Sequence, residues 1–163
     1  MSKDNKFAGT YEVSPAAGYA GNVAPATAWK ILSERKDAVL IDVRTRPEWN
    51  YVGLPDLERL AKKPTLIEWQ EFPSMQLNAD FVASLSGALA DKDTPLLFLC
   101  RSGVRSAAAA KAMTAAGYSR CLNVTDGFEG PLNAEAKRGW LEVGRPPPDL
   151  RRDLEPLRVI QAS

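Results

Sequence analysis

Short apolar runs alternate along the chain with longer segments in which apolar positions recur every three or four residues. The short runs predict strands near residues 39–43, 65–69, 96–99 and 122–124. The longer segments predict helices near residues 26–36, 78–90 and 106–116, the first two with an apolar face. Strands that alternate with helices in this way indicate an α/β domain with a mostly parallel sheet and right-handed crossovers.

The clearest strand, loop and helix in succession lie between Pro95 and Gly117. The four apolar residues 96–99 follow the proline and suit a strand that is buried on both faces of a parallel sheet. Residues 106–116 are good helix formers, and Gly117 supplies a stop signal. Cys100 is therefore predicted at the carboxyl end of a strand, which is where open α/β sheets bind their ligands.

The loop that begins at Cys100 has the features of an anion site. Gly103 lets the backbone curl before the helix, so that N–H groups of the turn and of the helix start point at a common centre. Arg101 and Arg105 add two positive charges. Such a field favours the thiolate form of a cysteine, which is the nucleophile. The order strand, cysteine, glycine, arginine, helix therefore favours a reactive Cys100 over a buried structural cysteine.

Three stretches of the sequence carry a resemblance to a known family. Residues 100–105 read Cys-Arg-Ser-Gly-Val-Arg, residues 40–49 form an apolar strand that ends in Asp-Val-Arg with a glutamate nearby, and residues 123–130 are followed by Gly139 and Trp140. The first stretch resembles the six-residue active-site loop of the rhodanese family of sulfurtransferases. The other two are similar to its earlier and its C-terminal signatures. In order and spacing, the match covers roughly residues 23–147.

The resemblance implies a three-layer rhodanese-like α/β domain, with a central mostly parallel sheet flanked by helices. It implies that Cys100 is the catalytic residue. The rest of the loop is expected to bind the substrate: Arg101, Ser102, Gly103, Val104 and Arg105. Supporting roles are expected for residues near the loop, with the Asp42 carboxylate helping to fix it: Asp42, Arg44, Glu48 and Ser106.

The reaction implied by the resemblance is the transfer of a sulfane sulfur through a persulfide on Cys100. The donor is a small molecule such as thiosulfate, and the acceptor is cyanide, a small thiol or a protein cysteine. The two half-reactions share one covalent intermediate, so ping-pong kinetics are expected. No metal and no organic cofactor are needed for this chemistry.

Two other functions remain open from the sequence. A cysteine-dependent phosphatase or arsenate reductase also places a cysteine and an arginine around an anion-binding loop. Four residues separate Cys100 from Arg105, whereas those phosphatases have five, and the shorter loop makes a tight cradle for tetrahedral phosphate. Asp126 or Glu129 would have to supply the general acid.

The other alternative is a non-catalytic sulfur carrier or regulatory module, although degenerate modules of the family usually lose the cysteine that this chain keeps.

Composition narrows the function classes further. The chain has 163 residues, which suits one domain, and a formal net charge of +1, which gives no electrostatic case for nucleic acid or a membrane surface as partner. Two cysteines argue against a disulfide-stapled secreted domain. The sequence has no transmembrane run, and its first residues are not followed by the apolar core of a signal peptide. A cytoplasmic location is therefore expected.

The absence of histidine from the sequence removes several mechanisms at once. A Ser-His-Asp triad, a Cys-His nucleophile pair and a His-ligated zinc site cannot be built within this chain. The electrostatics of the loop are then the activator that the sequence offers to Cys100.

The predicted organisation is an irregular lead-in over residues 1–22, the domain over residues 23–147 and a tail over residues 148–163 that begins with prolines. The tail is expected to pack on the surface in cis or on another subunit, which leaves the oligomeric state open.

Three apolar side chains from the end of the second predicted strand onward are interpreted as a cover over the core or, alternatively, as the wall of a pocket: Trp69, Phe72 and Met75. Cys121 is expected to pack inertly, with a Cys100–Cys121 resolving pair as the alternative.

Overall fold

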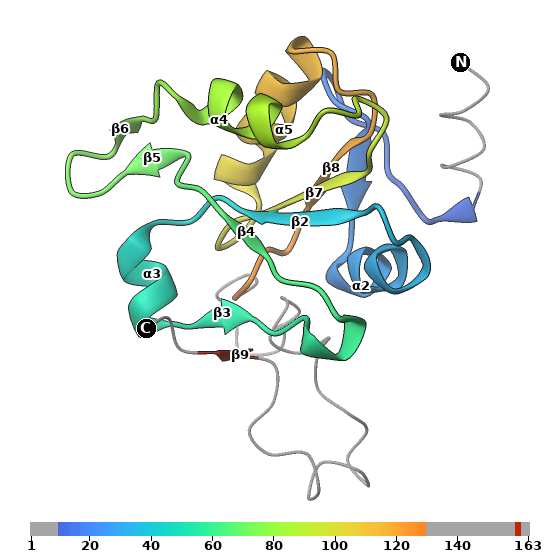
Figure 1. Ribbon diagram of the computed structural model, residues 1–163, viewed down its shortest axis with the longest axis horizontal. Helices are drawn as coiled ribbons and strands as arrows, with labels where there is room; N and C mark the ends of the chain where they lie inside the picture. Colours follow the sequence, from blue (N-terminus) through green and yellow to red (C-terminus); the bar gives the residue numbers. More distant parts are fainter. Residues whose placement is uncertain (1–9, 130–158, 161–163) are drawn as a thin grey trace, which may run out of the picture.

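The sheet at the centre of the molecule contains five strands, and every neighbouring pair in it is parallel. The computed structural model describes residues 10–129 and 159–160. Within the sheet, strands follow the order β1-β8-β7-β2-β4 (Figure 1). Their bounds, in that order, are Gly21–Val23, Cys121–Val124, Leu96–Leu99, Val39–Asp42 and Thr65–Leu66.

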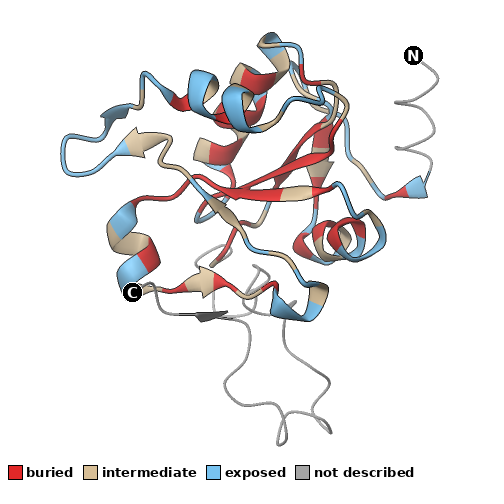
Figure 2. Ribbon diagram, viewed as in Figure 1, coloured by how far each residue is buried: buried red, intermediate tan, exposed pale blue. Residues whose placement is uncertain are grey.

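Helices cover both faces of this sheet, as the α/β pattern of the sequence predicts (Figure 1). Helix α2 (Pro25–Glu34) lies on one face, and α4 (Phe81–Ala88) and α5 (Val104–Ala115) lie on the other. Because all four residues of β7 are buried, this strand contributes to the core on both sides of the sheet (Figure 2). The two cores alternate along it, with Leu97 and Leu99 facing α2 and Leu96 and Phe98 facing α4 and α5.

Several short elements surround the three layers. Helix α3 (Arg46–Tyr51) follows β2, and β3 (Leu54–Pro55) and a 3-10 turn η1 (Glu58–Leu60) lead back towards β4. Strands β5 (Gln70–Glu71) and β6 (Gln76–Leu77) form a small hairpin, and β9 (Val159–Ile160) pairs with β3 in antiparallel fashion.

The main elements occur where the sequence predicts them, with shifted ends. The third predicted helix begins earlier, at Val104, and the second begins later, at Phe81. Asn78 explains the later start, because its side chain accepts from the N–H of Asp80 and donates to the carbonyl of Glu68, which shapes a turn before the helix. Residues 70–77 form a hairpin rather than an irregular loop.

The segment before the predicted domain also contributes to the fold. Gly21 and Asn22 belong to β1, and the ring of Tyr11 is 6% exposed within the core on the α2 side. Among the aromatic residues after β4, Trp69 packs edge-to-face on Phe81 at 5.0 Å between ring centroids. Phe72 instead lies exposed on the hairpin.

The register brings the carboxyl ends of three strands together. Asp42 of β2 lies opposite Leu99 of β7, and Phe98 lies opposite Asn123 of β8. The loops that leave these strands therefore emerge at one edge of the sheet, where Cys100 is the first residue after β7. In the described parts of the chain, every helix is too short or too polar to cross a bilayer.

Candidate active site

Cys100 lies between the end of β7 and the start of α5, as predicted, and the residue is 1% exposed. Gly103 adopts φ +107° immediately before the helix, and its N–H donates to Cys100 Sγ at 3.1 Å. Val104 and Arg105 thus belong to the first turn of α5 rather than to the loop. The N–H of Gly103 is thus one donor to the sulfur. A cradle in which further N–H groups of residues 101–105 also point at the sulfur stays a prediction.

The loop after β8 packs backbone to backbone on the Cys100 loop. The N–H of Phe128 donates to the carbonyl of Cys100 at 2.7 Å, and the N–H of Glu129 donates to the carbonyl of Arg101 at 3.1 Å. A Cβ on Gly103 would lie 2.2 Å from the carbonyl oxygen of Thr125. A Cβ on Gly127, which has φ +64°, would lie 2.4 Å from the carbonyl oxygen of Arg101. Both glycines are therefore required for the two loops to approach this closely.

Arg101 of the Cys100 loop and Arg105 of α5 are both paired with carboxylates. Arg105 binds Glu48 of α3 in bidentate fashion, at 2.7 and 3.0 Å, and Arg101 Nε lies 3.1 Å from Glu129 Oε2. Arg105 is half-buried, whereas 47% of the Arg101 side chain is exposed. Arg105 is thus held against the protein while Arg101 projects into solvent.

The Glu48–Arg105 pair is fixed from the Glu48 side as well. Glu48 Oε1 accepts from the N–H and the hydroxyl of Thr45 at the start of α3. Burial opposes ionisation of Glu48, but the hydrogen bonds from Arg105 and Thr45 outweigh it, so the pKa of Glu48 is lowered. The bond to Glu48 raises the pKa of Arg105 despite its burial, and the charges of Cys100 and Asp42 add to this rise. Arg105 therefore stands close enough to Cys100 for their charges to interact.

Asp42 and Arg44 form a buried ion pair that supports the neighbouring loop. Arg44 donates to both carboxylate oxygens of Asp42 and, at 2.9 Å, to the carbonyl of Gly53, and both side chains are fully buried. The Arg44 guanidinium lies over the Phe128 ring at 4.0 Å. Since the N–H of Phe128 also binds the Cys100 carbonyl, the support expected from Asp42 passes through Arg44 and Phe128.

The remaining loop residues divide into exposed and buried positions. Ser102 and Val104 are exposed, and Val104 is 78% exposed beside the buried sulfur. Ser106 is fully buried, with its Oγ 3.2 Å from Cys100 Sγ and 2.6 Å from Asn123 Oδ1. Sequence reasoning assigned no role to Asn123. A polar residue in the otherwise apolar β8 was the available signal.

Cys121 does not join the site. It lies opposite Leu96 in the sheet, and Leu96 is four residues before Cys100. Along the strand direction, four residues separate the Cα atoms of the two cysteines by about 13 Å. A disulfide needs Cα atoms within about 7 Å, so a Cys100–Cys121 resolving pair does not fit this sheet. Burial raises the pKa of the Cys121 thiol to about 11, which agrees with inert packing.

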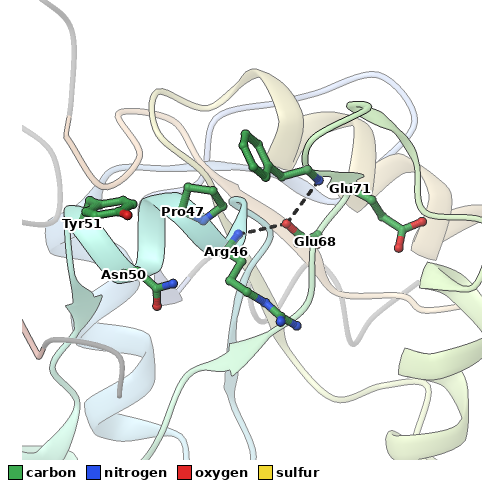
Figure 3. Close-up of a pocket in the computed structure, with 7 residues that line it drawn as sticks. Arg46, Pro47, Asn50, Tyr51, Glu68 and Glu71 are labelled. Carbon is green, nitrogen blue, oxygen red and sulfur yellow. Dashed lines mark hydrogen bonds between the residues drawn. The ribbon is translucent and has the colours of Figure 1, made fainter.

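An open hollow of about 560 Å³ lies between α3 and the β5–β6 hairpin (Figure 3). Glu68 connects the two sides of the hollow, because the Glu68 carboxylate accepts from the N–H of Arg46 and, at 3.5 Å, from the N–H of Phe72. Cys100 is absent from its lining, which comprises Arg46, Pro47, Asn50, Tyr51, Glu68, Glu71 and Phe72. No group of three acidic or cysteine side chains within residues 10–129 is arranged to hold a metal ion.

Comparison with known proteins places this geometry among relatives. The family model described as STR4 middle domain matches residues 20–152. An uncharacterized protein of Rickettsia rickettsii is 40% identical over 126 residues, which cover 77% of this chain and 94% of that protein. The chloroplastic rice protein named Thylakoid Rhodanese-Like is 31% identical over 77% of this chain and 25% of its own length. The crystal structure of Rv0390 from M. tuberculosis is 43% identical, with a TM-score of 0.69 over 77% of this chain and 95% of that one.

A glycine pair tests the contact between the two loops. We expect Gly103→Ala to destabilise the protein by about 1–3 kcal/mol through backbone strain, with the clash at Thr125 adding to the loss. The matched control is Gly87→Ala in α4, where an added Cβ meets nothing within 4 Å. There the change should stabilise by about 0.5–1 kcal/mol. Urea unfolding measures both values, and equal effects at the two positions would contradict the close approach.

The Glu48–Arg105 pair predicts a pH-dependent contribution to stability. Because the folded pKa of Glu48 lies below its usual 4.5, its ionised form stabilises the fold above that pH, and the contribution is lost as the pH falls through the folded value. The difference in unfolding free energy between the wild type and Glu48→Gln should therefore be largest near neutral pH and shrink in acid. Urea unfolding over a pH series measures it, and a constant difference would refute the assignment.

Proposed function

The chain belongs to the family of the STR4 middle domain, and on that premise we propose that it is a sulfurtransferase that works through a persulfide on Cys100. Its rhodanese-like α/β fold places this cysteine at the carboxyl end of the central strand. The observation that carries the proposal is the Gly103 N–H directed at Cys100 Sγ from the start of a helix, with Arg105 nearby. A dipole and a cation at this point favour an anionic sulfur.

The proposed cycle has two half-reactions. In the first, the Cys100 thiolate attacks the outer sulfur of a donor such as thiosulfate, the sulfur–sulfur bond of the donor breaks, and sulfite leaves with the bonding electrons. In the second, cyanide or a thiolate attacks the outer sulfur of the persulfide. The sulfur–sulfur bond on Cys100 then breaks and restores the thiolate. The enzyme alternates between two covalent states, so the kinetics are ping-pong.

The neighbouring residues have distinct parts in this cycle. Gly103 donates to the sulfur anion through its backbone, and Arg105 stabilises the negative charge that moves to sulfite. Arg101, which is exposed, contacts the anionic donor at the mouth of the loop. Ser102 and Val104 form the exposed rim across which donor and acceptor arrive, and an exposed rim also accommodates a protein cysteine as acceptor.

The remaining features of the proposal follow from this chemistry. The cycle needs neither a metal nor an organic cofactor, and neither nucleic acid nor a membrane takes part. The two cysteines are both free thiols, which suits a reducing compartment. We place the reaction in the cytoplasm on this ground.

A cysteine pair tests the mechanism directly. With thiosulfate and cyanide as substrates, Cys100→Ser should abolish thiocyanate production, while Cys121→Ser should retain it, because Cys121 lies outside the site. Intact mass after thiosulfate treatment should show one extra sulfur atom in the wild type and in Cys121→Ser, and none in Cys100→Ser. Thiocyanate production that survives Cys100→Ser would refute the mechanism. Release of phosphate from a phosphate ester, measured in parallel without sulfur transfer, would favour a phosphatase instead.

An arginine pair tests the assigned charges. Arg105→Ala removes a cation near the sulfur and leaves Glu48 unpaired, and both changes oppose an anionic donor. We expect kcat/KM for thiosulfate to fall by at least about tenfold. Arg101→Ala should have a smaller effect, because the Arg101 side chain is 47% exposed and water screens its charge more strongly than that of the half-buried Arg105. Steady-state kinetics with varied thiosulfate measure both, and an unchanged kcat/KM in Arg105→Ala would show that this arginine does not serve the donor.

A further inference from the structure

Beneath Cys100 lies a buried chain of hydrogen bonds that leads from the sulfur to β8. Cys100 Sγ and Ser106 Oγ are 3.2 Å apart, and the Ser106 hydroxyl is 2.6 Å from Asn123 Oδ1. The amide nitrogen of Asn123 donates to the carbonyl of Gly103 at 3.2 Å and to Asn22 Oδ1 at 3.1 Å. Cys100, Ser106 and Asn123 are between 0 and 4% exposed. Bulk water therefore does not complete this network.

The carbonyl of Gly103 fixes the orientation of the Asn123 amide. A backbone carbonyl only accepts hydrogen bonds, so the amide nitrogen of Asn123 must face Gly103. The amide oxygen then faces Ser106, and because this oxygen also only accepts, the Ser106 hydroxyl must donate to it. Asn123 thereby directs the single proton of Ser106 away from the sulfur.

This orientation has a different consequence for each protonation state of Cys100. When Cys100 is a thiol, its S–H donates to Ser106 Oγ, and every group in the network has a partner. When Cys100 is a thiolate, the Gly103 N–H still donates to the sulfur, but Ser106 donates to it only by turning away from Asn123. The amide oxygen of Asn123 then loses the donor that it has in the structure, which is costly at a buried site.

We propose that Asn123 is a positioning residue that acts through Ser106 to favour the thiol form of Cys100 over its thiolate form. Ser106 is the switch, because its hydroxyl accepts from the thiol or donates to the thiolate by rotating about one bond. The proposal rests on the sulfurtransferase function for its role in the cycle. In that role, Asn123 opposes the Gly103 N–H and Arg105, which favour the anionic sulfur, and so limits the fraction of the reactive thiolate before the donor binds.

The charged groups around the sulfur come from several elements. Arg105 belongs to α5, its partner Glu48 to α3, and the buried Asp42–Arg44 pair lies at the end of β2. Arg101 and its partner Glu129 lie on the two facing loops. Substitution of Asn123 or Ser106 by a neutral residue leaves all six charges in place. A change in the titration of Cys100 in such variants therefore reports the hydroxyl rather than the field of these groups.

The test follows the ultraviolet absorbance of the thiolate with pH, after subtraction of the same titration of Cys100→Ser. Asn123→Ala frees the Ser106 proton for the sulfur, so the titration midpoint should fall by about one pH unit, which is tenfold in the thiol–thiolate equilibrium. Ser106→Ala removes the switch, and adding Asn123→Ala to it should give no further shift. Asn22→Ala is the matched control: it removes the other partner of the Asn123 amide nitrogen, and the midpoint should stay unchanged.

Two outcomes would overturn the proposal. One is a midpoint in Asn123→Ala that is unchanged or higher, and the other is an equal downward shift in the absence of the Ser106 hydroxyl. Asn123→Leu is measured in parallel, as a second variant of similar side-chain size that has no acceptor for the Ser106 hydroxyl and should also lower the midpoint. The titration needs no sulfur transfer, so its failure is distinguishable from failure of the proposed function, which the thiocyanate assay reports separately.

Discussion

The close contact between two backbone loops is the constraint on which the site depends. The loop after β8 donates an N–H to the carbonyl of Cys100, and Gly103 and Gly127 are the points at which the loops nearly touch. This contact holds the curled backbone that directs the Gly103 N–H at the sulfur. A cysteine on an unsupported loop would lack a fixed donor, and preorganised donors are what give such sites their strength.

Strand β8 contributes to the Cys100 site in a second way. Its Asn123 side chain reaches Ser106 beneath the sulfur, while the loop that follows the strand holds the backbone above it. The hydrogen bonds beneath the sulfur and the shape of its loop thus both depend on β8 and on the loop that follows it. Since parallel pairing with β7 fixes where this strand ends, the chemistry of the site is tied to the register of the sheet.

Sequence patterns predicted the fold and the position of Cys100 because long-range burial leaves a strong local signal. Four consecutive apolar residues before a cysteine, a glycine and an arginine are typical of a buried strand that ends in an anion-binding turn. The hairpin at residues 70–77 was missed because its strands are two residues long and mostly exposed. Helix α3 was also missed, although Thr45 and Glu48 have the spacing of a capping box. Asn123 could not be assigned, because its role arises from contacts with Ser106 and Gly103, which only the folded chain brings together.

The pairing of charges at the site has a consequence for how molecules reach it. Arg101 is matched by Glu129, Arg105 by Glu48 and Arg44 by Asp42, so these pairs place three cations and three anions at this edge of the sheet. At separations beyond a few ångströms these charges cancel, and a chain with a net charge of +1 adds little to them. These paired charges of the described residues therefore do not steer anions towards the sulfur from a distance, as strongly cationic clefts do. For the proposed reaction, selection among sulfur compounds then takes place at contact, and the rate of encounter should depend only weakly on ionic strength.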